Sequence, residues 1–166
     1  MVTYHFAAKD DLVGAVIADV LASMREYLRP RLVAADAERF PERFVSAYVT
    51  GWVGYYRAHA RQVVALIRIH DGFRDESRRP HPAFGERAGE VAMVAQVLEH
   101  GQARGVFGAF DAPVMAAVIK AAVDDLLMRY IDDQGLDLEA YGTELVALFE
   151  RATRPGLGAG SSRVPS

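Results

Sequence analysis

The chain has 166 residues, of which 51% are hydrophobic and 25% charged, with a net charge of -3 and no cysteine. This length suits one domain with a sizeable core. The acidic balance argues against a general nucleic-acid-binding surface, which must be basic to contact phosphates. The lack of cysteine excludes disulfides, thiolate zinc sites and cysteine nucleophiles.

Hydrophobic residues are never gathered into a run of the roughly 20 needed to cross a bilayer. The first residues also lack the basic region and apolar core of a signal peptide. We therefore expect a cytoplasmic protein with no membrane partner.

The first long helix is predicted from about Lys9 to the mid thirties, with Asp10 and Asp11 in its first turn, where acidic side chains complement the helix dipole. Apolar residues follow at three- and four-residue steps, so one face should be buried. Pro30 removes a backbone hydrogen bond, and we expect a kink or an end at residues 27–29.

A second helix should begin at Pro41 and be central, because two adjacent stripes make it apolar around most of its girth. These stripes comprise Phe44, Val45, Tyr48, Val49, Trp52, Val53, Tyr55, Tyr56 and His59. A break is expected at residues 59–61, then a short helix through Phe73 and a charged loop to Pro82.

Helical periodicity returns from about Phe84 and closes near residues 101–105. Asp111 should cap a helix over residues 114–133, with Pro113 in its first turn, and Asp137 should cap the last helix. The Gly- and Ser-rich segment from Pro155 is predicted to be disordered. Strand periodicity is missing throughout, so the predicted fold is all-α, with about six helices.

Two stretches carry a resemblance to the TetR family of bacterial repressors. Tyr4, His5, Phe6, Lys9 and Leu12 resemble the pattern that ends the family's DNA-binding domain, although Ala8 stands where a capping residue is usual. The connection at residues 105–113 is similar to the family's link into its penultimate helix.

The resemblance implies three segments: residues 1–8 as the end of a helix-turn-helix domain, residues 9–154 as an effector-binding and dimerisation domain, and residues 155–166 as a tail. It also implies that Tyr4, His5 and Lys9 would contact the DNA backbone. Because a helix-turn-helix needs both of its helices, we expect operator binding only where the missing N-terminal helices are present.

A pocket for a small apolar or aromatic effector is predicted beside the aromatic stripe of the second helix, because such pockets are apolar with a few orienting polar groups. The alternative is that these side chains are plain core residues. The candidate ligand-binding residues are Tyr48, Trp52, Tyr55, His59, Arg68, His70, Phe73, Met93, Gln96 and Asp124. Asp125, next to the last of these, is expected to face solvent.

Catalysis is not predicted, since the sequence shows no nucleophile motif, phosphate loop or catalytic carboxylate pair. The five histidines have no metal-binding spacing, and we expect no metal or cofactor.

The last two helices are predicted to form a homodimer interface, in which two copies of each make a four-helix bundle. The alternative is that their apolar stripes serve only the core of one chain. The candidate interface residues are Ala117, Val118, Ala121, Tyr141, Leu145, Leu148 and Phe149.

The resemblance thus implies the ligand-sensing and dimerisation region of a repressor whose effector relieves DNA binding. The alternative is an orphan helical module that binds a small molecule or a partner without binding DNA.

Overall fold

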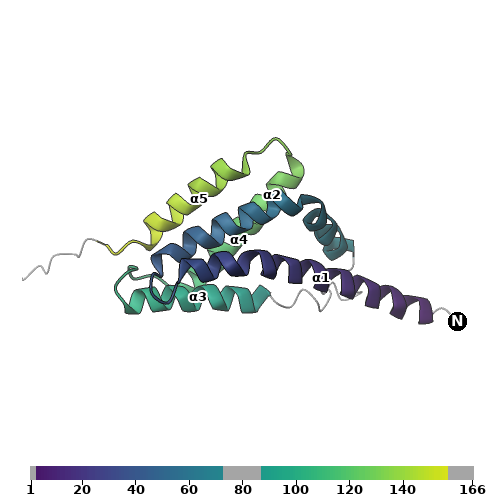
Figure 1. The fold of residues 1–166 in the computed structure, drawn as a ribbon, viewed down its shortest axis with the longest axis horizontal. Helices are drawn as coiled ribbons and strands as arrows, with labels where there is room; N and C mark the ends of the chain where they lie inside the picture. The colour runs from purple at the N-terminus through teal and green to yellow at the C-terminus, as the bar shows by residue number, and fades with distance from the viewer. Residues whose placement is uncertain (1–2, 73–86, 157–166) are drawn as a thin grey trace, which may run out of the picture.

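The computed structural model describes residues 3–72 and 87–156, which form five helices and no strand. Figure 1 shows the helices α1 (Thr3–Ala35), α2 (Glu42–Gly72), α3 (Arg87–Ala103), α4 (Ala112–Asp132) and α5 (Leu138–Thr153). The predicted all-α fold is therefore confirmed. None of these helices combines the length and the apolar character needed to span a bilayer.

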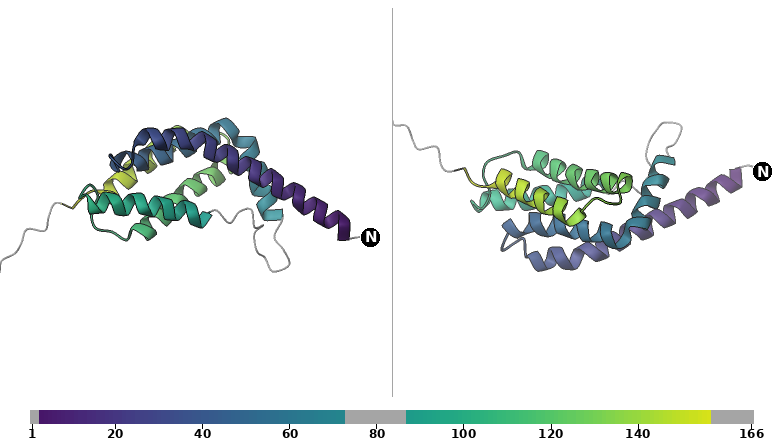
Figure 2. Two further views of the ribbon diagram at one scale, coloured as in Figure 1. Left: turned by 60° about the horizontal axis from the view of Figure 1, so that its bottom comes forward. Right: turned by 90° about the horizontal axis from the view of Figure 1, so that it is seen from above.

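The centre of the bundle is α2, which packs against α1 on one side and against α4 and α5 on the other, while α3 lies beside α4. Figure 2 shows α4 and α5 together on the side of the bundle away from α1. The predicted central role of α2 is confirmed, because both of its stripes are buried as far as Tyr56, while His59 at the end of one stripe is only partly buried. The buried residues are Phe44, Val45, Tyr48, Val49, Trp52, Val53, Tyr55 and Tyr56.

Two glycines let neighbouring helices approach α2 closely. A Cβ atom at Gly51 would lie 2.9 Å from a methyl carbon of Leu28 on α1, and one at Gly142 on α5 would lie 2.6 Å from a methyl carbon of Val53. Both distances are shorter than van der Waals contact, so larger residues would push α1 or α5 away from the central helix.

The predicted start of the first helix near Lys9 is wrong, because α1 is continuous from Thr3. Ala7 and Ala8 are strong helix formers, and no glycine or proline separates them from the preceding residues. The N-terminal end of α1 projects beyond the rest of the bundle (Figures 1 and 2).

Pro30 does not end α1, which continues to Ala35. The proline lies on the exposed side of the helix, where water can satisfy the carbonyl that loses its partner. The helix ends at the predicted place, because Asp36 adopts a left-handed conformation with a φ of 49°.

The break predicted at residues 59–61 is a kink inside α2, where His59 has non-helical angles of φ -127° and ψ 25°. The two predicted helices on either side of it are therefore one element. This merger explains why the structure has five helices where about six were expected.

Both predicted caps of the last two helices are confirmed. An Asp111 carboxylate oxygen accepts the backbone N–H of Val114 at 2.8 Å, and an Asp137 oxygen accepts those of Glu139 and Ala140 at 3.0 Å. These bonds satisfy N–H groups that have no partner within a helix.

Several predictions lie outside the described residues. They concern Phe73, the loop to Pro82 and the tail beyond residue 156, together with the side chains of Tyr4, His5, Lys9 and His70.

Candidate functional site: a groove beside a buried polar cluster

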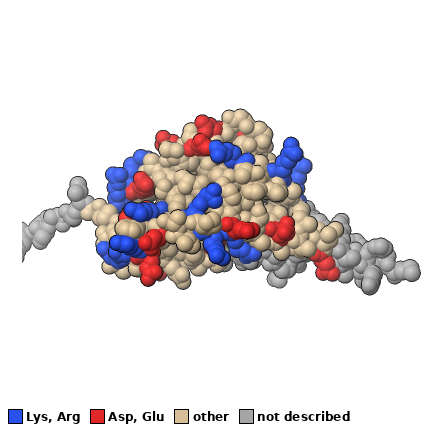
Figure 3. Space-filling view, in the orientation of Figure 1, with Lys and Arg blue, Asp and Glu red and all other residues tan. Residues whose placement is uncertain are grey.

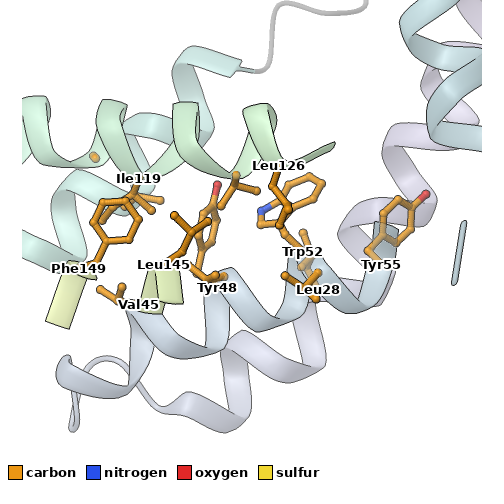
Figure 4. Close-up of a cluster of buried hydrophobic side chains, with 14 of the residues drawn as sticks. Leu28, Val45, Tyr48, Trp52, Tyr55, Ile119, Leu126, Leu145 and Phe149 are labelled. Carbon is orange, nitrogen blue, oxygen red and sulfur yellow. The ribbon is translucent and has the colours of Figure 1, made fainter. Parts of the chain in front are cut away.

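Aromatic rings run along the buried side of α2 (Figure 4). Ring centroids are 6.3 Å apart for Tyr48 and Trp52, and 6.3 Å apart for Trp52 and Tyr55. Further along the helix, the His59 ring stacks on Tyr55 at 4.5 Å, and its Nδ1 lies 2.8 Å from the side-chain oxygen of Gln62. The aromatic stripe therefore belongs to the core, and Tyr48 also reaches a groove described below.

Beside these rings, a buried lysine contacts residues of the three helices α2, α3 and α4. Lys120 on α4 is only 7% exposed; it pairs with Asp124 one turn later, and its Nζ lies 3.7 Å from a carboxylate oxygen of Glu90 on α3. The ammonium also lies 5.0 Å from the centre of the Trp52 ring on α2. A buried ammonium would be costly without such partners, so the cluster fixes α4 relative to α2 and α3.

Glu90 also binds the phenol of Tyr48, whose hydroxyl donates to the other carboxylate oxygen at 2.6 Å. Burial raises the pKa of Tyr48, and the negative charge of Glu90 raises that pKa further. The phenol therefore stays protonated in the folded protein at pH values at which an exposed tyrosine has ionised.

This shift predicts a loss of stability at high pH. Above about pH 10 an unfolded tyrosine loses its proton while folded Tyr48 keeps it, so the unfolded state binds fewer protons. The Tyr48 term should lower the free energy of unfolding by about 1.4 kcal/mol per pH unit there. Urea denaturation between pH 9 and 11, the range around the ordinary tyrosine pKa of about 10, should give a steeper decline for the wild type than for Tyr48→Phe. If the free energy of unfolding fell equally with pH in the two proteins, the raised pKa of Tyr48 would be contradicted.

Two core side chains have polar atoms without a hydrogen-bond partner of normal geometry in the described part of the chain: Trp52 Nε1 and the Tyr55 hydroxyl. Figure 4 shows the indole nitrogen of Trp52 on the side that faces Tyr48. Burial raises the pKa of Tyr55, while Ser23 on α1 is close enough to lower it in part. Such atoms are places where a polar group of a ligand can pair.

A groove of about 770 Å³ runs between α1 and α3 and ends at the polar cluster. Its size is in the range of small-molecule sites. Apolar side chains make most of its wall, two arginines of α1 stand at its rim, and Tyr48 and Glu90 form its inner end. The lining residues are Arg25, Leu28, Arg29, Leu32, Val33, Tyr48, Gly89, Glu90 and Met93. Figure 3 shows charged side chains of both signs on the face that carries α1 and α3.

The predicted ligand residues divide into groups. Tyr48 and Met93 line the groove, Trp52 contacts Tyr48 from behind, and Asp124 joins the polar cluster through Lys120. Arg68 and Gln96 are exposed and do not line this groove, so the structure does not bring them together with Tyr48 and Met93. The adjacent Asp125 is exposed as expected and pairs with Arg129, with a nitrogen–oxygen distance of 2.6 Å.

Sequence reasoning missed Glu90, Lys120 and the two groove arginines. Lys120 is one of only two lysines and interrupts an apolar helix four residues before Asp124, a spacing that pairs opposite charges on a helix. That spacing could have identified the pair. Glu90 gave no such signal, since its partners are distant in the sequence.

The predicted dimer residues also divide. Ala117, Ala121 and half-exposed Val118 and Leu148 lie on the surface, and Tyr141 is partly buried. Leu145 and Phe149 are instead buried in the core of the single chain, because they point from α5 into the space between α2 and α4 (Figure 4). Placing these two in the interface is therefore corrected.

Within residues 3–72 and 87–156, His, Asp and Glu side chains form no group of three or more that could hold a metal ion. The candidate features of the described residues are the groove, the polar cluster behind it and the exposed apolar residues on α4 and α5.

Comparisons with known proteins found a solved structure with a similar fold. No protein-family model and no curated protein matches the chain. A solved structure of a protein of unknown function from Rhodococcus sp. RHA1 is similar, with a TM-score of 0.66 and 17% sequence identity over 86% of this chain and 72% of that one. At this identity the likeness concerns the fold alone, and the chain shares its helical architecture with that protein.

Proposed function

We propose that the chain is the effector-sensing and dimerisation region of a TetR-like transcriptional repressor that acts in the cytoplasm. One observation carries the proposal: a single helix, α1, both projects beyond the bundle and lines the groove with Leu28 and Leu32. A DNA-binding head joined to the projecting end would be rigidly linked to whatever fills the groove.

The projecting part of α1 has an apolar surface that suits such a head. Leu12 is 65% exposed near this end and Val16, one turn further along α1, is 41% exposed; a packed neighbour would remove both from water. The TetR-like motif noted in the sequence lies on the same stretch, and the two features together support a covering domain at this end.

The outer face of α4 and α5 supports a dimer. Val114, Val118 and Met128 are large apolar residues on the exposed side of α4, and Leu148 lies on the exposed side of α5. Residues 114, 118, 121 and 128 repeat at helical spacing and form one stripe. Two such faces related by a two-fold axis would bury both stripes in a four-helix bundle.

Effector action then follows from linkage. A ligand in the groove would favour one separation of α1 and α3, and two heads carried by a dimer bind successive major grooves only at a matched spacing. The ligand relieves repression to the extent that it binds the other conformation more tightly. This account assigns the chain no catalytic role.

A DNA-binding assay tests the proposal. A version of the chain extended upstream in its gene to include a helix-turn-helix should bind DNA from around its own gene, and the present chain should not. The affinity of the extended version should fall steeply with salt, because phosphate contacts release counterions. An extended version without DNA affinity would favour the orphan binding module instead.

A further inference from the structure

The groove between α1 and α3 has an apolar wall and two arginines at its rim. Leu28, Leu32, Val33 and Met93 supply the wall, and burial of apolar ligand surface against them provides affinity without much specificity. The polar residues at the two ends therefore decide which head group a ligand can carry.

At the inner end of the groove, the negative charge of Glu90 is already paired with the ammonium of Lys120. The Glu90 carboxylate accepts from the Tyr48 hydroxyl at 2.6 Å and faces the Lys120 ammonium at 3.7 Å. A cationic head group placed there would compete with that ammonium for the same carboxylate. Glu90 thus offers little to an amine and leaves the inner end suited to an uncharged tail.

The outer end carries two guanidinium groups, of which that of Arg29 is the one assigned to the ligand. Arg25 and Arg29 are one helical turn apart on α1, are exposed, and both line the rim. A guanidinium presents a fork of N–H donors that matches a carboxylate in two parallel hydrogen bonds. The chain as a whole has a net charge of -3, so attraction of an anion would be confined to places such as this rim.

We infer that the groove binds an apolar carboxylic acid, with its hydrocarbon part against Leu28, Leu32 and Met93 and its carboxylate at the guanidinium of Arg29. The inference deepens the proposed function, because its regulatory meaning rests on the groove being the effector site. The binding itself would hold equally for a chain that never touches DNA.

Intrinsic fluorescence gives a direct readout. Trp52 is the single tryptophan of the chain and contacts Tyr48, which lines the groove. Titration with octanoate, nonanoate and decanoate should change its emission with one site per chain. The dissociation constant should fall roughly fourfold for each added methylene until the chain fills the groove.

The head group is tested with decylamine and decanol, which carry the same hydrocarbon chain. Both should bind at least about tenfold more weakly than decanoate, because neither pairs with a guanidinium as a carboxylate does. If either bound as tightly as decanoate, or if none of the three acids bound, the inferred ligand class would be wrong.

Two pairs of variants locate the site. Arg29→Gln should weaken decanoate binding about tenfold, whereas Arg61→Gln, which changes an exposed arginine outside the groove, should not. Val33→Asp should abolish binding by placing a carboxylate in the groove, whereas Leu12→Asp changes another exposed apolar residue and should leave it unchanged. Equal effects within either pair would show non-specific adsorption and overturn the inference.

The outcomes separate the two proposals. Decanoate binding by a chain that is monomeric, and whose extended version does not bind DNA, would keep the groove assignment and reject the repressor function. A dimeric chain whose extended version binds DNA, but which ignores all three acids, would keep the repressor function and reject the ligand class.

Discussion

Trp52→Ala should lower the free energy of unfolding by about 3–5 kcal/mol, the usual cost of removing a buried aromatic side chain of this size. The side chain is 5% exposed and contacts Tyr48, Tyr55 and Tyr56. Its loss leaves a cavity at the centre of α2 and also removes the ring beside the Lys120 ammonium. Because folded domains are stable by only about 5–15 kcal/mol, this one change should remove a large part of the free energy of unfolding.

Urea denaturation followed by circular dichroism measures this loss, since the substitution removes the fluorescence signal. Trp52→Phe is the matched control, because it keeps a ring in the same place and should cost less than half as much. All variants must be compared at one protein concentration, because dimerisation, as proposed, would contribute to apparent stability. A loss below about 0.5 kcal/mol for the alanine variant, the range of ordinary surface substitutions, would contradict the packing described for this residue.

The double substitution Val118→Asp with Leu148→Asp should raise the dissociation constant of the proposed dimer by more than about a hundredfold, since two-fold symmetry would bury four unpaired carboxylates in its interface. Val118 is 49% exposed and Leu148 is 51% exposed in the single chain. The folded monomer should therefore tolerate both aspartates. Sedimentation equilibrium measures the constant, and thermal unfolding verifies that each chain is still folded.

Leu12→Asp provides the control for this pair. It also introduces a carboxylate at an exposed apolar position, but on α1, away from the α4–α5 face (Figure 2). Its dimer should keep the wild-type dissociation constant. If the double variant were as dimeric as this control, the proposed interface would lie elsewhere on the molecule.

Local patterns in the sequence predicted the parts of the fold that depend on local interactions. The two apolar stripes of α2 identified the central helix, because helical spacing alone determines which side chains share a face. Asp111 and Asp137 identified two helix starts, because a cap bonds N–H groups within three residues of itself.

The incorrect predictions concern residues whose burial or backbone conformation depends on packing against other helices. Pro30 was expected to kink or end α1, but the helix does not end there, since the proline is exposed to water and α1 packs along α2. Leu145 and Phe149 share a face with plausible interface residues, yet they are buried because α5 turns that side toward α2 and α4. A helical period shows that a face is apolar and does not show which neighbour covers it.

The candidate site was predicted only in part for the same reason. Tyr48 and Met93 were identified as aromatic and apolar side chains on facing helices, but the partners that give the site its charge come from separate helices. Glu90 meets Tyr48 across 42 positions in the sequence, and no local pattern of a single sequence reports such a pair.

The mass of the wild-type chain in solution tests the central claim most directly, because the sensing account requires two copies joined through α4 and α5. Sedimentation at micromolar concentration should give the mass of two chains of 18.2 kDa each, with dissociation on introduction of the two aspartates. A species with the mass of one chain across that concentration range would contradict the account.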